Sequence, residues 1–138
     1  MTDKALMCSL SEMQGALFEM GGAEGYDSET FIRVFMRSKI AEGLDSDFDF
    51  TQWAGKEYIM ERMKEEYPEG FSQKGIVFDS ETLYWAGYLY RYWHFYTGES
   101  SKDIYKQADA QTVNTMYYGY HTLDIEMAID RLKEAKKK

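Results

Sequence analysis

Residues 80–96 read SETLYWAGYLYRYWHFY, and this stretch decides the fold of the chain. On a helical wheel at about 100° per residue, large apolar side chains fill an arc of roughly 140°: Tyr84, Trp85, Tyr88, Leu89, Tyr92, Phe95 and Tyr96. Ala86, Trp93 and Tyr90 extend the apolar character to about 240°, so only Gly87, Arg91 and His94 occupy a polar sector. A helix that is apolar on nearly all sides lies at the centre of a core, or is half core and half binding surface. We therefore expect a central helix at 80–96, and both readings of its aromatic face stay open.

The rest of the chain also divides into segments of helical length. Glycines and the single proline, Pro68, separate these segments, and no stretch alternates convincingly between apolar and polar residues. Asp27 and Asp79 each begin an Asp-Ser-Glu-Thr string and are suited to cap a helix N-terminus. A first helix should end at Gly21 and Gly22, and the others are expected at about 28–42, 51–66, 80–96, 101–107, 109–118 and 124–136.

These segments predict an all-α fold, a compact bundle of about six to seven helices around the central aromatic helix. The chain of 138 residues is long enough for one domain, 1–138, with a substantial core. Four lysines make residues 133–138 a basic C-terminal tail, which most simply complements the negative end of the last helix dipole.

Composition excludes several classes of function. The chain has 24 acidic and 16 basic residues, a net charge of −8, which disfavours nucleic acid and an anionic membrane surface as partners. No run of about 18 uncharged apolar residues occurs, so we expect no membrane span. The single cysteine, Cys8, excludes an internal disulfide framework and a cysteine-based zinc site. We expect a cytoplasmic protein without cofactors.

The candidate partner-binding residues are Tyr90, Arg91, Trp93 and His94, at the edge of the aromatic arc. Trp93 is expected to be a surface anchor, whereas Trp85 and Tyr92 should be buried together, since tyrosine, tryptophan and arginine most often anchor protein interfaces. Arg91 and His94 are neighbours on one helix face and could hold a phosphate or carboxylate, or His94 could act as a general base. The structural alternative is an arginine paired with an acidic neighbour and a histidine bonded to a tyrosine or a carbonyl.

Other sequence motifs lack residues that their functions require. Residues 45–49 resemble the start of a calcium loop, but the required glycine and glutamate are replaced by Phe50 and Lys56. Residues 101–118 resemble a helix-turn-helix, yet the turn is about two residues short and few basic side chains are present to neutralise phosphates. No phosphate-binding glycine loop, metal-binding motif or nucleophile elbow occurs.

Several strings together resemble a family of short, uncharacterised helical bacterial proteins associated with toxin–antitoxin-like gene neighbourhoods, beside ADP-ribosyltransferase-like partners. The strings are residues 85–93, 97–105, 120–123 and 127–129, together with 31–36 and 48–53. The resemblance would cover most of residues 5–132. It implies a role beside a cognate protein and assigns no individual residue.

The sequence therefore predicts a non-enzymatic protein-interaction module, an antitoxin-like partner of a cognate protein. Aromatic anchors and nine adaptable methionines on an acidic body favour this function, and the acidic charge would steer the chain towards a basic partner. One alternative is a DNA-associated regulator that uses a degenerate helix-turn-helix at about 101–118. Another is a small-ligand binder that uses Arg91 and His94.

Overall fold

A computed structural model describes residues 4–46, 54–71 and 74–137, and these residues confirm the all-α prediction. They form eight α-helices and a short 3₁₀ turn. The elements are α1 (Lys4–Ala23), α2 (Ser28–Met36), α3 (Lys39–Asp45), α4 (Lys56–Glu66), η2 (Pro68–Phe71), α5 (Ser80–Thr97), α6 (Ser101–Gln107), α7 (Ala110–Tyr120) and α8 (Ile125–Lys137). Most of the acidic stretch 45–49 lies outside the described residues, as do Phe48, Phe50 and Trp53, so the interpretations of these positions remain predictions.

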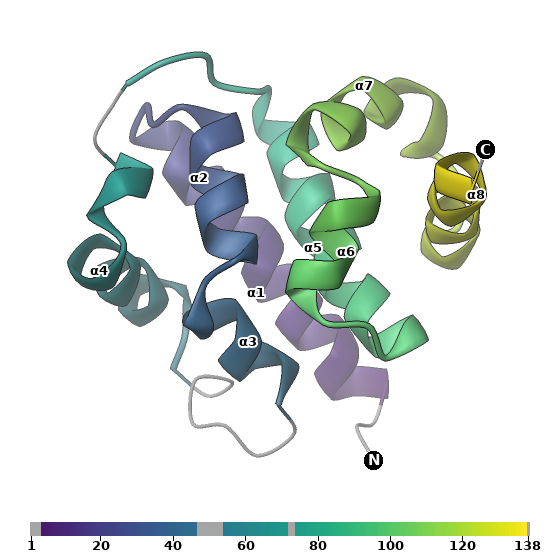
Figure 1. Ribbon diagram of the computed structural model, residues 1–138, viewed down its shortest axis with the longest axis horizontal. Helices are drawn as coiled ribbons and strands as arrows, with labels where there is room; N and C mark the ends of the chain where they lie inside the picture. The colour runs from purple at the N-terminus through teal and green to yellow at the C-terminus, as the bar shows by residue number, and fades with distance from the viewer. Residues whose placement is uncertain (1–3, 47–53, 72–73, 138) are drawn as a thin grey trace.

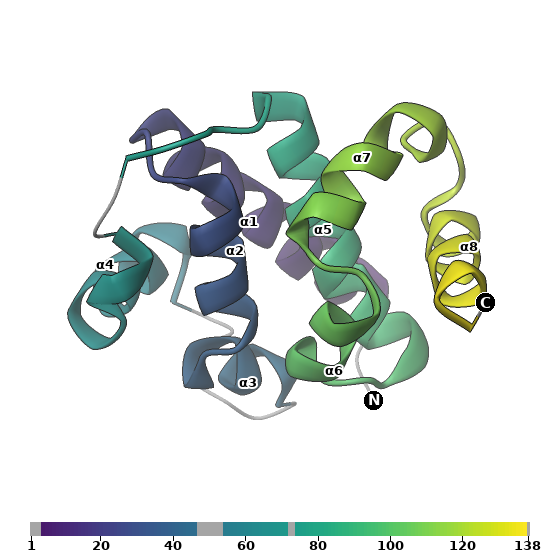
Figure 2. The same ribbon diagram turned by 45° about the horizontal axis from the view of Figure 1, so that its top comes forward.

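Helix α5 is central, as its sequence predicts. It packs along α1 and also contacts α6, α7 and α8, while α2, α3 and α4 build the other half of the bundle (Figure 1). Turning the molecule shows α8 at one end and α4 at the other, with α5 behind α6 and α7 (Figure 2). Leu89, Tyr90 and Trp93 of α5 are 0% exposed. None of the helices in the described part of the chain is long and apolar enough to cross a membrane.

The predicted helix at 28–42 is in fact two helices, α2 and α3, which is why the described residues form eight helices instead of the seven expected. The break falls at Ser38, whose hydroxyl accepts a hydrogen bond from the backbone N–H of Ala41 at 3.1 Å and donates one to the carbonyl oxygen of Phe35 at 2.7 Å. A serine that caps a helix in this way competes with a continuous helical backbone.

The two aspartates expected to act as caps behave differently. Asp27 caps α2, because its carboxylate accepts from the N–H of Thr30 at 3.1 Å. Asp79 occupies the same position before α5, but its side chain makes no capping hydrogen bond. The other end of α5 closes at Gly98, which adopts a left-handed conformation with φ of 80°.

Glycines near the end of α1 allow close helix packing, and the predicted stop at Gly21 and Gly22 falls one residue before the end of the helix. Helix α1 runs on to Ala23, and Gly21 and Gly22 face Phe31 and Leu83. The closest approach is between Gly15 of α1 and Gly87 of α5. A methyl group at Gly87 would lie 2.8 Å from the Cα atom of Gly15 and would collide with the backbone carbonyl of Gln14.

We expect Gly87→Ala to destabilise the protein by about 2 kcal/mol or more, although alanine is the better helix former by about 1 kcal/mol. The backbone of α1 must move to accommodate the methyl group, and this backbone packs against α5 along its length. Gly119→Ala in α7 is the matched control, because nothing lies within 4 Å of the added methyl group. It should raise stability by up to about 1 kcal/mol. Urea unfolding of both variants measures the effects, and a stabilised Gly87→Ala protein would contradict the packing.

Candidate functional site

The side chain of Arg91 is the hub of a buried polar network. Its guanidinium is 0% exposed and donates hydrogen bonds from Nε to Gln14 at 2.8 Å and from one terminal nitrogen to Asp45 at 2.6 Å. The other terminal nitrogen donates to the hydroxyl of Ser101 at 3.1 Å. Because these partners come from α1, α3 and α6, Arg91 on α5 joins four helices.

Asp45 completes this network. One carboxylate oxygen accepts from Arg91 and from the hydroxyl of Ser101 at 2.8 Å, and the second accepts from the backbone N–H of Ser101 at 2.8 Å. Burial lowers the pKa of Arg91, and the nearby Asp45 charge opposes that shift. A buried guanidinium is tolerated only when it is paired and hydrogen-bonded in this way. The network therefore fixes the helices and leaves Arg91 without access to a ligand.

Three of the four candidate partner-binding residues of α5 lie inside the core. Tyr90, Arg91 and Trp93 are fully buried, so they form no exposed surface, and the hydroxyl of Tyr90 donates to the carbonyl of Ala108 at 2.7 Å. His94 is partly buried, and its Nδ1 lies 2.7 Å from the carbonyl oxygen of Glu99 and 3.6 Å from Asp45. Arg91 and His94 therefore match the structural alternative, an arginine paired with an acidic residue and a histidine bonded to a carbonyl. Gln14 and Asp45, the partners of Arg91 on α1 and α3, lie far from it in sequence, so the helical wheel could not reveal them.

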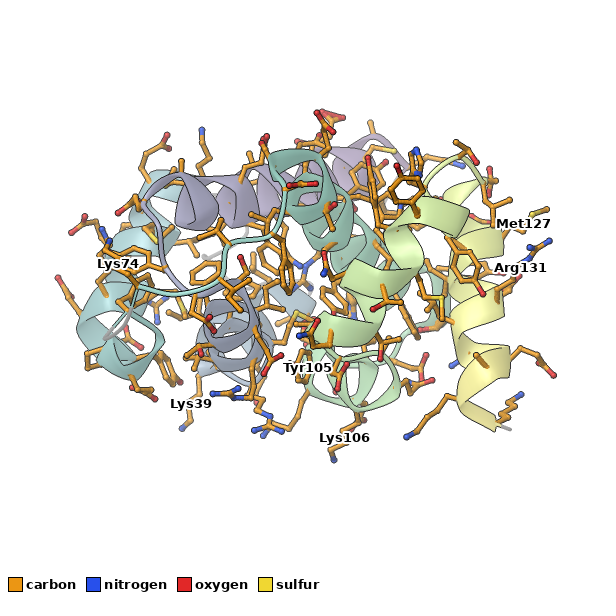
Figure 3. The ribbon with its side chains drawn as sticks, turned by 90° about the horizontal axis from the view of Figure 1, so that it is seen from above. Lys39, Lys74, Tyr105, Lys106, Met127 and Arg131 are labelled. Atoms are coloured by element: carbon orange, nitrogen blue, oxygen red, sulfur yellow. The ribbon has the colours of Figure 1, made fainter. Side chains whose placement is uncertain are left out.

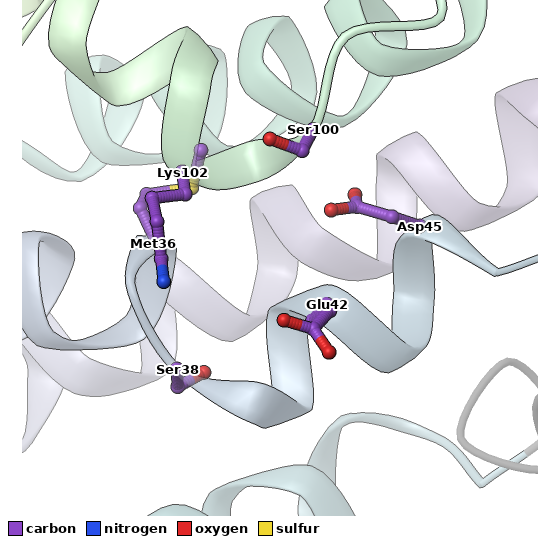
Figure 4. Close-up of a pocket in the computed structure, with 6 residues that line it drawn as sticks. All are labelled: Met36, Ser38, Glu42, Asp45, Ser100 and Lys102. Carbon is purple, nitrogen blue, oxygen red and sulfur yellow. The ribbon is translucent and has the colours of Figure 1, made fainter.

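A small pocket opens beside the network, at the outer side of Asp45. Its volume is about 80 Å³, and its lining comes from α2, α3 and the start of α6: Met36, Ser38, Glu42, Asp45, Ser100 and Lys102. Figure 4 shows Asp45, Glu42 and Ser100 around the pocket, while Lys102 lies beside Met36. Small-molecule sites usually exceed about 300 Å³. No group of three or more metal-ligating side chains occurs among the described residues.

A second polar cluster surrounds Glu99, between α5, α6 and α8. Its carboxylate accepts hydrogen bonds from the indole of Trp93 at 2.9 Å, from Lys133 at 2.7 Å and from Gln107 at 2.6 Å. Burial alone would raise the pKa of Glu99, but these hydrogen bonds outweigh it and lower the pKa to about 2. Lys133 therefore belongs to the packed body of the protein rather than to a free basic tail.

This cluster predicts a loss of stability in acid. The pKa of Glu99 is depressed from its usual 4.5, so its contribution is present above about pH 4.5 and is lost as the pH falls towards 2. Allowing for its 28% exposure, we expect this contribution to be on the order of 2 kcal/mol. Glu99→Gln should lower stability at pH 7 and flatten the decline between pH 4.5 and 2. Denaturant titrations at several pH values test this, and an unchanged decline in Glu99→Gln would contradict it.

Helix α5 also carries a row of tyrosines at four-residue spacing: Tyr84, Tyr88, Tyr92 and Tyr96, named here the tyrosine row. The ring centroids of Tyr84 and Tyr88 lie 6.4 Å apart, and those of Tyr88 and Tyr92 lie 6.1 Å apart with nearly parallel planes. Tyr84 and Tyr88 are half-buried, Tyr92 is buried and Tyr96 is 39% exposed. Burial therefore varies along the row, with Tyr92 the most buried of the four and Tyr96 the most exposed.

Carboxylates border the tyrosine row. The hydroxyl of Tyr92 donates to Glu126 of α8 at 2.9 Å, and that of Tyr96 donates to Asp130 at 3.0 Å. Burial raises the pKa of Tyr84, and the nearby Glu12 and Glu19 of α1 raise it further. Burial and the hydrogen bond to Glu126 raise the pKa of Tyr92 to about 12. The tyrosines therefore stay neutral beside negative charge.

Helices α7 and α8, which pack against α5, also carry partly or fully exposed aromatic and apolar side chains. Trp85 is half-buried and packs edge-on against Tyr117 of α7, with the ring centroids 5.6 Å apart. Tyr118 is 88% exposed and Met127 is 46% exposed. Figure 3 shows Met127 and Arg131 together on α8 at the end of the molecule. These side chains lie on faces that the sequence assigned to the core or did not single out.

Helices α6 and α7 correspond to the helix-turn-helix alternative. Only Ala108 and Asp109 connect them, which matches the short turn expected from the sequence. Asp109 caps α7 by accepting from the N–H of Thr112 at 3.0 Å. An acidic group at this helix start is unfavourable for a contact with DNA phosphates.

Comparisons of the chain with protein-family models, curated proteins and solved structures find no match. The toxin–antitoxin-like resemblance accordingly stays a prediction from the sequence, and the function is inferred from the geometry.

Proposed function

We propose that this chain is a non-enzymatic, cytoplasmic protein-interaction module that binds a basic segment of a cognate protein, in the manner of an antitoxin-like partner. The observation that carries the proposal is the tyrosine row with its carboxylate border. The binding residues are Tyr84, Tyr88 and Tyr96, which replace the four candidates chosen from the sequence.

The chemistry of the row favours a protein ligand. Tyrosine buries a large, rigid area with little loss of side-chain entropy and is enriched among the residues that dominate binding energy. Tyr84 and Tyr88 are half-buried, so their rings are held in place by α5 before any partner arrives. Met127 on α8 and Tyr118 on α7 add exposed apolar area on the two helices that pack against α5.

The charge of the surface favours lysine and arginine in the partner. Cations are attracted to the faces of aromatic rings, and the attraction strengthens when carboxylates flank the ring. Glu12 and Glu19 lie near Tyr84, and Glu126 and Asp130 accept hydrogen bonds from the row. The net charge of −8 would also accelerate encounter with a basic protein.

No catalytic step is included in the proposal. Arg91, Asp45 and Glu99 direct their strong hydrogen bonds to other groups of the chain. Their geometry supports a structural role.

The test is a binding assay with the products of adjacent genes, each co-expressed and purified with this chain. A hot-spot residue is worth about 2 kcal/mol, so Tyr88→Ala should weaken binding roughly 30-fold. Tyr58→Ala is the matched control, because Tyr58 is 44% exposed on α4, at the other end of the bundle. Glu12→Lys should weaken binding more at low salt than at high salt. Equal affinity of the Tyr88→Ala and Tyr58→Ala proteins would reject the tyrosine row as the contact surface.

A further inference from the structure

We propose that a pocket between α2 and η2 binds a phosphate group through Arg33, Arg37 and Tyr67. The pocket has a volume of about 190 Å³ and is lined by these three residues with Val34 and Glu69. Complete small-molecule sites usually occupy about 300–1,000 Å³. The pocket is therefore sized for one charged group rather than for a whole cofactor.

Two arginines on one helix face provide the positive charge. Arg33 and Arg37 are four residues apart on α2, and like charges at this spacing destabilise a helix. Among the described carboxylates, none forms an ion pair with either guanidinium. Arg37 instead lies over the ring of Tyr105, with 5.8 Å between the guanidinium carbon and the ring centroid. A bound anion would relieve the repulsion, and the guanidinium fork matches phosphate oxygens.

Tyr67 supplies a hydrogen-bond donor. Its hydroxyl oxygen accepts from the backbone N–H of Lys39 at 2.9 Å, which holds the group at the edge of the pocket. Within the described part of the chain, the hydroxyl hydrogen of Tyr67 has no acceptor. A phosphate oxygen in the pocket would provide one.

Glu69 opposes the two arginines, because its carboxylate lines the same pocket. It would reduce the affinity for any anion, but two arginines against one carboxylate leave the lining with a net positive charge, which attracts a doubly charged anion more strongly than a singly charged one. We therefore expect phosphate, which approaches two negative charges at neutral pH, to bind more tightly than acetate. Glu69 also allows a variant whose expected effect has the opposite sign.

The experiment is a calorimetric titration with sodium phosphate, phenyl phosphate and sodium acetate, at pH 7.5 and constant ionic strength. Arg33→Gln and Arg37→Gln should each weaken phosphate binding about tenfold or more, the expected loss of one charge-assisted hydrogen bond. Glu69→Gln should strengthen it several-fold. Arg131→Gln is the matched control, since Arg131 lies on α8 far from Lys39 and the pocket (Figure 3), and should leave binding unchanged.

The titrations also identify the source of the phosphate group. Equal affinities for phosphate and phenyl phosphate support recognition of the phosphate alone, and tighter binding of phenyl phosphate supports a phosphate ester. Absence of saturable phosphate binding would overturn the proposal. Equal weakening by Arg131→Gln and Arg37→Gln would overturn it too, because the effect would then reflect net charge. The tyrosine row on α5 takes no part in this pocket, so the phosphate site and the proposed protein-binding function can each fail without the other.

Discussion

Asp45→Ala is expected to destabilise the protein by about 3 kcal/mol, a large share of the stability of a domain of this size. The variant leaves the guanidinium of Arg91 fully buried without its counter-charge, while the bonds to Gln14 and Ser101 remain. Removing one partner of a buried pair typically costs about 3–5 kcal/mol. We expect the lower end, because the side chain of Asp45 is 10% exposed and water can enter in its place.

The double variant Asp45→Ala with Arg91→Met separates the stability lost through an unpaired buried charge from the stability lost through poorer packing. Methionine fills most of the volume and carries no charge, so the double variant should be more stable than Asp45→Ala alone by about 1 kcal/mol or more. Asp103→Ala serves as the surface control, since its side chain is 63% exposed and 3.7 Å from Lys106. It should cost at most about 1 kcal/mol. Chemical denaturation measures all three, and strictly additive losses in the double variant would contradict the argument.

The sequence was sufficient to predict the helices but not their contacts. Helical spacing and glycine positions located α5, α6 and α8 to within a few residues, because these signals are local. The break at Ser38 was missed, since a serine inside an apolar helical pattern is ambiguous until its hydroxyl is seen to cap Ala41. Gly21 and Gly22 were interpreted as a stop, whereas their role depends on Phe31 and Leu83 from other helices.

The exposure of the candidate site residues was predicted wrongly for the same physical reason. A helical wheel ranks faces by apolarity, and the two polar residues of α5 were assigned to the surface because of their charge. In the structure Arg91 is buried, because Asp45, Gln14 and Ser101 arrive from three other helices to satisfy it. With the polar sector turned inward, part of the aromatic arc is left at the surface. Tertiary partners, which the sequence pattern does not encode locally, thus decided which face of α5 is exposed.

Trp93→Ala should therefore cost about 3–5 kcal/mol, the range for large aromatic side chains in cores. This reverses the assignment made from the sequence, in which Trp93 was a surface anchor and Trp85 was buried. Trp93 is 0% exposed, and its indole N–H donates to Glu99. Trp85 is half-buried, so Trp85→Ala should cost less, about 1–2 kcal/mol.

A third variant, Trp93→Phe, separates the stability contributed by the buried ring from that contributed by its hydrogen bond. Phenylalanine retains much of the buried area but cannot donate to Glu99, so we expect a loss of about 1–2 kcal/mol, smaller than that of Trp93→Ala. Thermal and urea unfolding of the three variants give the ranking. If Trp85→Ala unfolds as readily as Trp93→Ala, the half-buried face of Trp85 is as important to the core as Trp93. Because Trp85 lies next to the tyrosine row, that face would then be unsuited to exchange its packing for a partner.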